Sequence, residues 1–387
     1  MDGGYWDFAG IGDGHRPCYS GEHVTHPREQ LMSRIKIAAL SLLVGLGGLV
    51  GCASNPGGGG DDTMGDDAPP FTNGVSTLTG SGEPGFVDGK RGAARFANPV
   101  HCAVGPDGKV YVADFDNGKI RVVDADGTTG TVIAQDKFRR PFGMAFIGST
   151  LYVGTDNNTL GAHDIDSGTV WKVNVSGKSA TVVAENIGRA RGLTALSDGR
   201  LALTDYQRHV VKTLDPNSGA ISLLAGTENT KGMVDATGTA ALFAQPYHLV
   251  QRADGKLIVV DYENNRLRLV DLQGNVTTYA GTGTAGNADG PVASATFNKP
   301  QGIMMTSNGD IFVTDLGNYT VRRIRGDVVT TIAGNGSAGY LDHDTNLSAQ
   351  FYGLEGICGK ADGSMLYVSD GGRGEDLPYN YIRQIKL

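Results

Sequence analysis

The sequence predicts an all-β fold, a six-bladed β-propeller whose blades each contain four antiparallel strands. Three observations lead to this fold. Short β-forming runs alternate with turn-forming residues, one strand pattern recurs six times, and the last blade lacks a strand that a segment near the amino terminus can supply. The 59 glycines among 387 residues fit a chain with many tight turns.

The clearest blade lies at residues 295–334. Its four β-forming runs are separated by Ser307-Asn308-Gly309, by residues 315–318 and by Gly326-Asp327. Short β-forming runs between Gly, Asn and Asp indicate antiparallel strands joined by tight turns. One such sheet cannot bury both of its faces, so it requires copies of itself alongside.

The second strand of this blade recurs through the chain. The residues that mark its end are Asp114, Thr155, Asp205, Asp261, Asp315 and Asp370. These six positions lie roughly 40 to 55 residues apart, a spacing typical of propeller blades. Six copies therefore predict six blades.

The fourth strand also recurs six times, and its first copy, residues 75–80, precedes every other strand. Residues 381–387 at the other end match a third strand with no fourth strand after it. We therefore expect residues 75–80 to complete the last blade and close the ring. A ring closed in this way has no exposed seam between its first and last blades.

A fixed set of landmark residues recurs within the blades. Blade five carries Pro300-x-Gly302, Asn308-Gly309, Val313-x-Asp315, Asn318 and Val321-Arg322. The corresponding residues in blades one and four include Pro99, Asp114, Asn117, Arg121, Pro246, Asp261, Asn265 and Arg268. This pattern resembles NHL repeats, and the resemblance covers residues 75–387, although blades two and three lack the Arg. It implies a propeller that usually serves as a binding platform, with enzymes on some related six-bladed scaffolds.

A glycine-rich insertion precedes four of the blades and leads into an A-x-F motif. The aromatic residues of the four motifs are Phe96, Phe243, Phe297 and Phe351. We expect each Phe to fill the space between neighbouring blades. The insertions also share an acidic residue, at Asp88, Asp235, Asp289 and Asp342. A rim that binds calcium or another ligand is one interpretation, but repetition in every such blade favours an Asp that ties its own loop by backbone hydrogen bonds.

The segment at residues 32–52 carries an export pattern. Arg34 and Lys36 precede an uncharged apolar run of about 15 residues, shorter than a membrane span requires. The run ends in Leu49-Val50-Gly51-Cys52, which resembles the lipobox of bacterial lipoproteins. The resemblance implies that residues 32–51 are a signal peptide and that Cys52 is acylated, for example with palmitate. An uncleaved apolar anchor or an ordinary signal peptide is the alternative.

The segments on either side of this pattern fit the same interpretation. Residues 1–31 match no signal, so we interpret them as an over-extended gene start or a disordered segment. Residues 52–74 are rich in Gly, Asp and Pro and predict a flexible tether to a propeller at residues 75–387. We expect a monomer in the cell envelope, with the outer membrane favoured because Ala53 rather than Asp follows Cys52. A net charge of −8 argues against non-specific nucleic-acid binding.

Candidate ligand-binding residues come from positions where the blades differ. Aligning the first strands puts Gly143, Gly192, Gly302 and Gly356 in one column, with His101 and His248 in blades one and four. The preceding column holds Val100, Phe142, Arg191, Tyr247, Gln301 and Glu355. We expect these residues to line the central channel. The candidate site residues are Arg191, Tyr247, His248, Gln301, Glu355 and His101.

A metal site would draw on the same residues, with calcium or zinc as candidate ions. Two histidines and Glu355 suit zinc by residue type, but blades one and four lie opposite each other, which predicts a wide separation of His101 and His248. Glu355 is the first candidate ligand, and its alternative is an ion pair with Arg191 across the channel. No catalytic residue is assigned.

Two related enzyme families were compared with these columns. Peptidylglycine amidating lyases carry zinc-binding histidines directly after the Pro, where this chain has Val100, Phe142, Tyr247 and Gln301, so the match fails. Glu355-Gly356 and Gln301-Gly302 are similar to parts of the gluconolactonase-like pattern, which holds one divalent ion. That similarity implies a metal-dependent hydrolase as the alternative to a binding module.

Cys102 and Cys358 lie on the first strands of blades one and six, which ring closure makes neighbours. A disulfide in an oxidising envelope compartment and two buried free thiols both fit. The main functional hypothesis is a lipid-anchored envelope propeller that binds or scaffolds a protein, a glycan or a small molecule. The alternative hypothesis is a gluconolactonase-like hydrolase that uses a divalent ion at the mouth of the channel.

Overall fold

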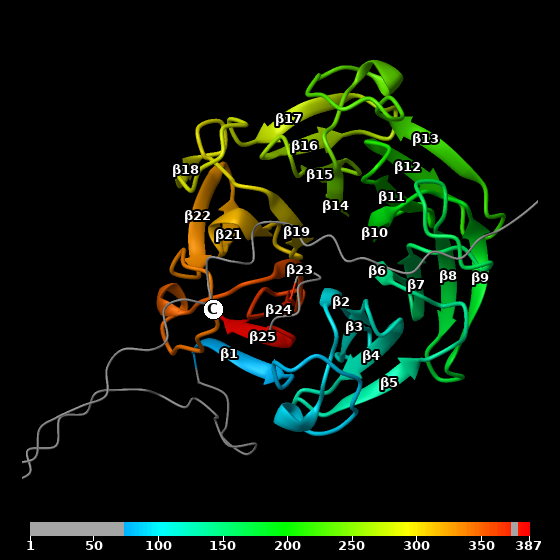
Figure 1. Cartoon of the computed structure of the whole chain (residues 1–387). Helices are drawn as coiled ribbons and strands as arrows, with labels where there is room; N and C mark the ends of the chain where they lie inside the picture. Colours follow the sequence, from blue (N-terminus) through cyan, green and yellow to red (C-terminus); the bar gives the residue numbers. More distant parts are fainter. Residues whose placement is uncertain (1–72, 373–377) are drawn as a thin grey trace, which may run out of the picture. The chain divides into compact units, whose positions relative to one another are not determined.

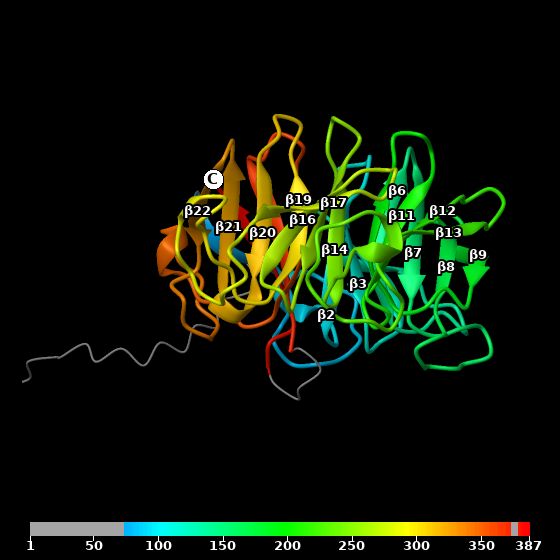
Figure 2. The ribbon, with the colours of Figure 1, turned by 90° about the horizontal axis from the view of Figure 1, so that it is seen from above.

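Six antiparallel sheets are arranged around a central axis in the computed structural model, which describes residues 73–372 and 378–387 (Figure 1). All of these residues belong to one of the two compact units of the chain, Asp62–Leu387. The innermost strand of each sheet faces the axis, and the strands run across the thickness of the ring (Figure 2). The predicted signal peptide, Cys52 and most of the tether lie outside the described residues.

The strands follow one another from the axis outward in blades one to three. Blade one contains β2 (Pro99–Val104), β3 (Val110–Asp114), β4 (Lys119–Val123) and β5 (Thr129–Ile133). Blade two contains β6 (Pro141–Ile147), β7 (Thr150–Thr155), β8 (Thr169–Asn174) and β9 (Ser179–Glu185). Blade three contains β10 (Ala190–Ala195), β11 (Leu201–Asp205), β12 (Val210–Leu214) and β13 (Ile221–Ala225).

Blades four and five follow the same order. Blade four contains β14 (Pro246–Gln251), β15 (Leu257–Asp261), β16 (Arg266–Val270) and β17 (Val276–Ala280). Blade five contains β19 (Pro300–Met305), β20 (Ile311–Asp315), β21 (Thr320–Arg325) and β22 (Val328–Ala333), with β18 (Gly290–Pro291) as an extra outer strand. Short 3₁₀ helices lie at Arg91–Ala93, Gly238–Ala240, Leu316–Asn318 and Asn346–Ser348.

Blade six is assembled from both ends of the propeller. It contains β23 (Leu354–Gly359), β24 (Met365–Asp370), β25 (Tyr381–Lys386) and, outermost, β1 (Gly74–Thr79). β1 pairs antiparallel with β25, for example at Val75 and Ile385. The predicted number of blades and the predicted closure by the amino-terminal strand are both confirmed.

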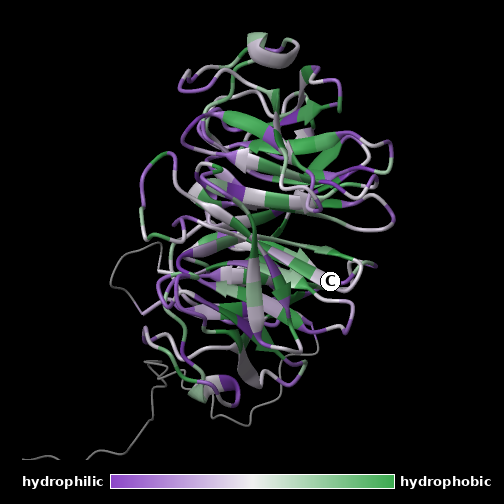
Figure 3. Cartoon of the chain, turned by 90° about the vertical axis from the view of Figure 1, so that its right-hand side faces the viewer, coloured by the Kyte–Doolittle hydropathy of each residue, from purple (hydrophilic) through white to green (hydrophobic). Residues whose placement is uncertain are grey.

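Six hydrophobic clusters hold the ring together, and each joins two neighbouring blades. The cluster between blades six and one, for example, brings Leu78 and Ile382 together with Phe96 and Val112. Hydrophobic residues gather on the strands and hydrophilic residues on the loops (Figure 3). Because the core lies between blades, each blade depends on both of its neighbours for burial.

A buried arginine on the third strand organises blades one, four, five and six. Arg322, which has no exposed surface, binds Asp315 of the second strand at 2.7 Å and Asp289 of the insertion at 2.7 Å. Its guanidinium also donates to the carbonyls of Thr296 and Ala288, and it stacks on Phe297 at 5.2 Å. The same arrangement recurs around Arg121, Arg268 and Arg383.

Each insertion aspartate therefore has a different role from the one expected. Asp289 binds Arg322 and accepts a hydrogen bond from the Thr331 amide of the fourth strand, whereas the sequence predicted that it ties its own loop. The carboxylate lies over the outer strand, so its partners come from distant sequence. The four Phe residues are buried between the blades as expected.

Another landmark is displaced by one residue in blade four. The sequence comparison selected Asn265, but Asn264 makes the bonds that Asn117 and Asn318 make in their blades. It donates to Asp261 at 2.8 Å and to the Gly232 carbonyl at 2.8 Å. Asn265 has a left-handed backbone with φ of 52° and accepts instead from the Lys299 amide.

Blades two and three replace the buried arginine by other means. In blade three Lys212 donates to Asp205 at 2.9 Å. In blade two Thr155 occupies the position of the Asp, and the Trp171 indole donates to its hydroxyl at 2.9 Å. The acidic residue of blade two is Asp156, one position later in the sequence. Its carboxylate binds Arg189 and Arg191 of blade three.

The structure joins Cys102 and Cys358 by a disulfide whose Cα atoms are 5.7 Å apart. The bond links β2 of blade one to β23 of blade six, beside the seam that β1 closes. It bridges residues 256 positions apart, so it restricts the unfolded chain strongly.

The buried arginine can be tested against an exposed neighbour on the same strand. Replacing Arg322 by Met leaves Asp315 buried without its cation, which should lower the free energy of unfolding by about 3–5 kcal/mol. Arg325→Met removes an ion pair whose arginine is largely exposed, and we expect little change. Urea unfolding of the two variants measures the difference, and equal losses would contradict the central role of Arg322.

The disulfide can be tested by peptide mapping of the unreduced protein. We expect one linked pair of peptides containing Cys102 and Cys358. The double variant Cys102→Ala, Cys358→Ala should unfold with a free energy lower by roughly 2–4 kcal/mol. Alkylation of both thiols in unreduced, denatured protein would show that they are free.

Candidate functional site

The innermost strands carry a β-bulge directly after their first residue. In β14 the pairing with β15 jumps from Pro246 to Leu249, and in β10 the pairing with β11 jumps from Ala190 to Gly192. All six innermost strands show this shift, and the skipped positions include Val100, Phe142, Arg191, Tyr247, Gln301 and Glu355. A bulge re-aims side chains. It therefore changes the side-chain alternation at the column selected from sequence.

The glycine column marks where neighbouring innermost strands touch. A Cβ on Gly356 would lie 2.6 Å from the His101 Cα, and a Cβ on Gly302 would lie 2.8 Å from the Glu355 carbonyl oxygen. No side chain fits at these contacts. His101 and His248 therefore mark the two blades where this tight contact is relaxed.

Arg191 forms an ion pair with a residue that the sequence analysis did not select. Its guanidinium lies 2.7 Å from one oxygen of Asp156, and Arg189 lies 2.7 Å from the other oxygen. Burial alone would raise the pKa of the Asp156 carboxyl, but Arg191 and Arg189 outweigh it and hold that pKa below its ordinary value. Asp156 is thus ionised and bound by two guanidinium groups.

Three aromatic side chains stack on Arg191, and two more pack against them. Arg191 stacks on Phe142 at 4.2 Å, on Tyr206 at 4.6 Å and on Phe115 at 5.5 Å. Tyr247 contacts the rings of Phe142, Tyr206 and Tyr262, with centroids 5.4 to 5.9 Å apart. We call Phe115, Phe142, Tyr206, Tyr247 and Tyr262 the aromatic cluster.

Glu355 acts on this cluster through its charge. Burial, with the negative charge of Glu355 as the next contribution, raises the pKa of the Tyr247 hydroxyl. Glu355 and Gln301 are themselves buried on the innermost strands of blades six and five. The charges of Arg191 and Glu355 therefore both reach Tyr247.

The expected separation of His101 and His248 is wrong. Their ring centroids are 4.3 Å apart although they come from opposite blades. Both side chains leave bulged strands toward the axis, which is narrow enough for them to meet. Burial lowers the pKa of both rings, that of His248 to about 4, so both imidazoles are neutral near pH 7.

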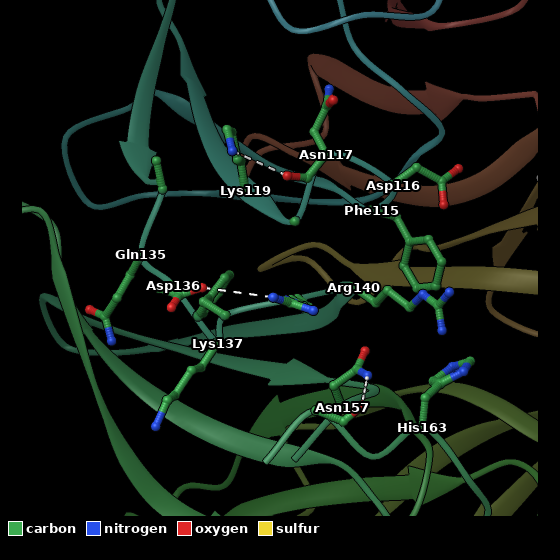
Figure 4. Close-up of a pocket in the computed structure, with 15 residues that line it drawn as sticks. Phe115, Asp116, Asn117, Lys119, Gln135, Asp136, Lys137, Arg140, Asn157 and His163 are labelled. Carbon is green, nitrogen blue, oxygen red and sulfur yellow. Dashed lines mark hydrogen bonds and ion pairs between the residues drawn. The ribbon is translucent and has the colours of Figure 1, made fainter. Parts of the chain in front are cut away.

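An open polar pocket of about 740 Å³ lies between blades one and two. Its walls are residues 115–119, residues 134–140, and Asn157, Gly161 and His163. Figure 4 shows Phe115, Arg140 and His163 gathered at one end of the pocket, with Gln135 and Lys137 at the other. Four Lys or Arg residues line it against two Asp residues.

The pocket is continuous with the aromatic cluster. Phe115 belongs to both, and the His163 Nε2 lies 3.6 Å from Asp156. Burial and the charges of Arg189 and Arg140 lower the pKa of His163, so it is neutral near pH 7. The Arg191–Asp156 pair thus lies between the innermost strands and the cationic pocket.

Curated relatives of this chain carry NHL repeats. "NHL repeat-containing protein 2" of Bos taurus is 26% identical over 297 residues, which cover 63% of this chain and 41% of that protein. "Protein SUPPRESSOR OF QUENCHING 1, chloroplastic" of Arabidopsis thaliana is 27% identical over 286 residues, 65% of this chain and 27% of that protein. The chain is an NHL-type propeller. It matches less than half the length of either relative, and no protein-family model matches it.

Solved structures share the fold of this NHL propeller. An auxiliary nutrient binding protein from Bacteroides thetaiotaomicron superposes with a TM-score of 0.63 at 18% identity, covering 80% of this chain and 75% of that one. A protein of unknown function from the same organism gives a TM-score of 0.63 at 19% identity, covering 81% and 75%. At these identities the similarity concerns the fold.

Several residues of the NHL propeller's site escaped the sequence analysis, including Arg189 and the pocket residues Lys137, Arg140 and His163. Four others share one column of the repeat. Phe115, Asp156, Tyr206 and Tyr262 each follow directly after the marker residue of the second strand. Reading this column across the blades would have shown aromatic residues in blades one, three and four and an Asp in blade two. The residue type at this position differs from blade to blade, as it does at the position of Arg191 and Tyr247.

Two features are absent from the described residues. No group of three or more His, Cys, Asp or Glu side chains gathers there in a way that could hold a metal ion. In the same part of the NHL propeller, no helix combines the length and the apolar character needed to cross a bilayer.

The Asp156 ion pair gives a pH-dependent prediction. Because its pKa is lower in the folded protein, its stabilisation is present above the ordinary value of 3.8 and is lost as the pH falls through the folded value. Asp156→Asn should cost about 3–5 kcal/mol at neutral pH, since the buried Arg191 and the partly buried Arg189 lose their counter-charge. The difference in free energy of unfolding between Asp156→Asn and the wild type should disappear once the pH is below the folded pKa of Asp156.

Melting curves from pH 7 to pH 2.5 measure this gap. Asp136→Asn is the control, because Asp136 lines the pocket but is exposed and lies 3.8 Å from an exposed Arg139. A gap that stays constant over the whole range would show that ionisation of Asp156 is not what the variant removes.

Proposed function

We propose that this NHL propeller is a lipid-anchored protein of the cell envelope that binds a small anionic ligand in the pocket between blades one and two. The loss of symmetry at the Arg191–Asp156 pair carries the proposal. Four blades use their acidic and basic landmarks to hold the fold, whereas blades two and three release Asp156, Arg189 and Arg191 toward the axis.

The charges of the pocket favour an anion. Asp136 lies near Arg139 at 3.8 Å, and Lys119 stacks on Phe86 at 4.6 Å. Lys137 and Arg140 remain as cationic groups of the pocket wall. A carboxylate or phosphate is the ligand chemistry that Arg and Lys recognise best.

The aromatic cluster adds a platform beside these charges. Phe115 lines the pocket, and the half-buried Tyr206, Tyr247 and Tyr262 continue the cluster behind it. A ligand with a flat or apolar body and an anionic group would use both surfaces. The auxiliary nutrient binding protein with the same fold is a precedent for binding on this scaffold.

The envelope location rests on the lipobox-like segment that ends at Cys52. In a bacterial host, we expect the wild-type chain to incorporate labelled palmitate and to sediment with the outer membrane. Cys52→Ser should lose the label and shift to the soluble fraction. Unlabelled wild-type protein, or unchanged sedimentation of the variant, would contradict lipidation at Cys52.

The pocket is tested with defined probes, because its natural ligand is not identified. Citrate and inorganic phosphate are titrated into the full chain by calorimetry, with glucose as the neutral probe. We expect an anion to bind with an affinity that falls as salt is added, because part of the attraction is electrostatic. Lys137→Gln with Arg140→Gln should weaken binding at least about tenfold, or about 1.4 kcal/mol.

Arg252→Gln is the matched control, an arginine paired with Asp254 on blade four, far from the pocket in the ring. Tyr206→Ala tests the aromatic platform separately. Equal binding in the pocket variant and the control would place any anion elsewhere. Stronger binding of glucose than of either anion would redirect the proposal to neutral glycans.

The hydrolase alternative requires Glu355 to join further ligands around a divalent ion. Glu355 contributes to the surroundings of Tyr247 on the axis, and the described residues gather no group of three His, Cys, Asp or Glu side chains. The described residues therefore do not assemble the three-ligand site that this alternative requires.

A further inference from the structure

The two histidines on the axis form a structural feature that the pocket does not explain. His101 on β2 and His248 on β14 occupy the column where four other blades have Gly. Their rings approach to 4.3 Å between centroids with an interplanar angle of 48°. Two opposite blades thus depart from the repeat in the same way, and their side chains meet.

Three of the four ring nitrogens have no hydrogen-bond partner among the described residues. They are Nδ1 and Nε2 of His101 and Nε2 of His248. His101 is 3% exposed and His248 is 6% exposed, so solvent is largely excluded. A buried polar atom without a partner is costly, and native structures normally supply one in the form of protein, water or an ion.

The fourth nitrogen fixes the orientation of His248. Its Nδ1 lies 3.3 Å from the carbonyl oxygen of Ile303 on the neighbouring blade. A carbonyl only accepts hydrogen bonds, so Nδ1 carries the proton and the lone pair lies on Nε2. A histidine anchored through one nitrogen to a backbone carbonyl, with the other nitrogen free, has the arrangement of a typical metal ligand.

We propose that His101 and His248 together bind one divalent transition-metal ion of the zinc, nickel or copper class on the axis of the propeller. Imidazole suits these metals, whereas calcium requires oxygen ligands. With metal–nitrogen bonds of 2.0–2.1 Å, two rings on one ion have centroids about 5 Å apart, so a ring shift of under about 1 Å admits the ion. Water or a bound small molecule completes the coordination.

The site differs from the anion pocket in ligand and in residues. No side chain of the pocket wall belongs to the histidine pair, so the two proposals can fail independently. An ion here would supply a positive centre on the axis near the buried Glu355 and the half-buried Tyr247.

The test uses the full chain after treatment with EDTA and dialysis. Residues 1–31 contain His15, His23, His26 and Cys18, so the number of bound ions alone does not identify the site. We therefore compare zinc stoichiometry and melting temperature of the wild type with those of His101→Gln and His248→Gln. Each variant should lose one bound zinc and the metal-induced rise in melting temperature of several degrees.

His343→Gln is the matched control, because His343 is a partly exposed histidine in the insertion before blade six, away from the axis. It should keep both the zinc and the rise in melting temperature, as should the Lys137→Gln, Arg140→Gln variant. An equal stoichiometry in wild type and His101→Gln would overturn the proposal.

Copper gives a spectroscopic readout in addition to the stoichiometry. The paramagnetic resonance spectrum of wild-type protein loaded with one equivalent of Cu²⁺ should show coupling to two imidazole nitrogens. Folded His248→Gln, checked by circular dichroism, should lose this spectrum. Coupling to the same set of nitrogens in His248→Gln would place the copper elsewhere and reject the site.

Discussion

The buried arginine of the third strand is the interaction on which the rest of the propeller depends. Arg121, Arg268, Arg322 and Arg383 each connect the second strand, the insertion and the Phe that fills the space between blades. A buried guanidinium is costly to desolvate. Two carboxylates, two carbonyls and an aromatic face together offset that cost. Each landmark therefore needs the others, which explains why they recur as a set.

The site arises where this set is incomplete. Lys212 and the Trp171–Thr155 pair hold blades three and two with fewer charges. Asp156 is then available to two arginines from blade three, and the aromatic cluster covers them. The blades with the arginine landmarks are held by a repeated set of contacts, whereas blades two and three leave Asp156, Arg189 and Arg191 to form a separate ion pair.

Most of the fold could be predicted from the sequence because each blade repeats the same strand and turn pattern, and because the order of the copies shows which strand is missing. The site was predicted only in part. Repeat alignment gives the angular position of His101 and His248 but not the width of the axis, so their contact was missed. Asn264 was missed because two Asn are adjacent and only the backbone conformation separates them.

The closure of the ring also sets the order in which the propeller can form. β1 is the first of the described strands to be synthesised and β25, its partner, is the last, so blade six stays incomplete while the other blades can already pack. Until β25 is made, Val75 and Leu78, which are buried in the finished blade, lack their cover. Once β25 is made, its outer edge stays open until β1 pairs with it. A second copy could donate its own β1 to that edge, so exchange of this strand is the characteristic assembly error that this architecture invites.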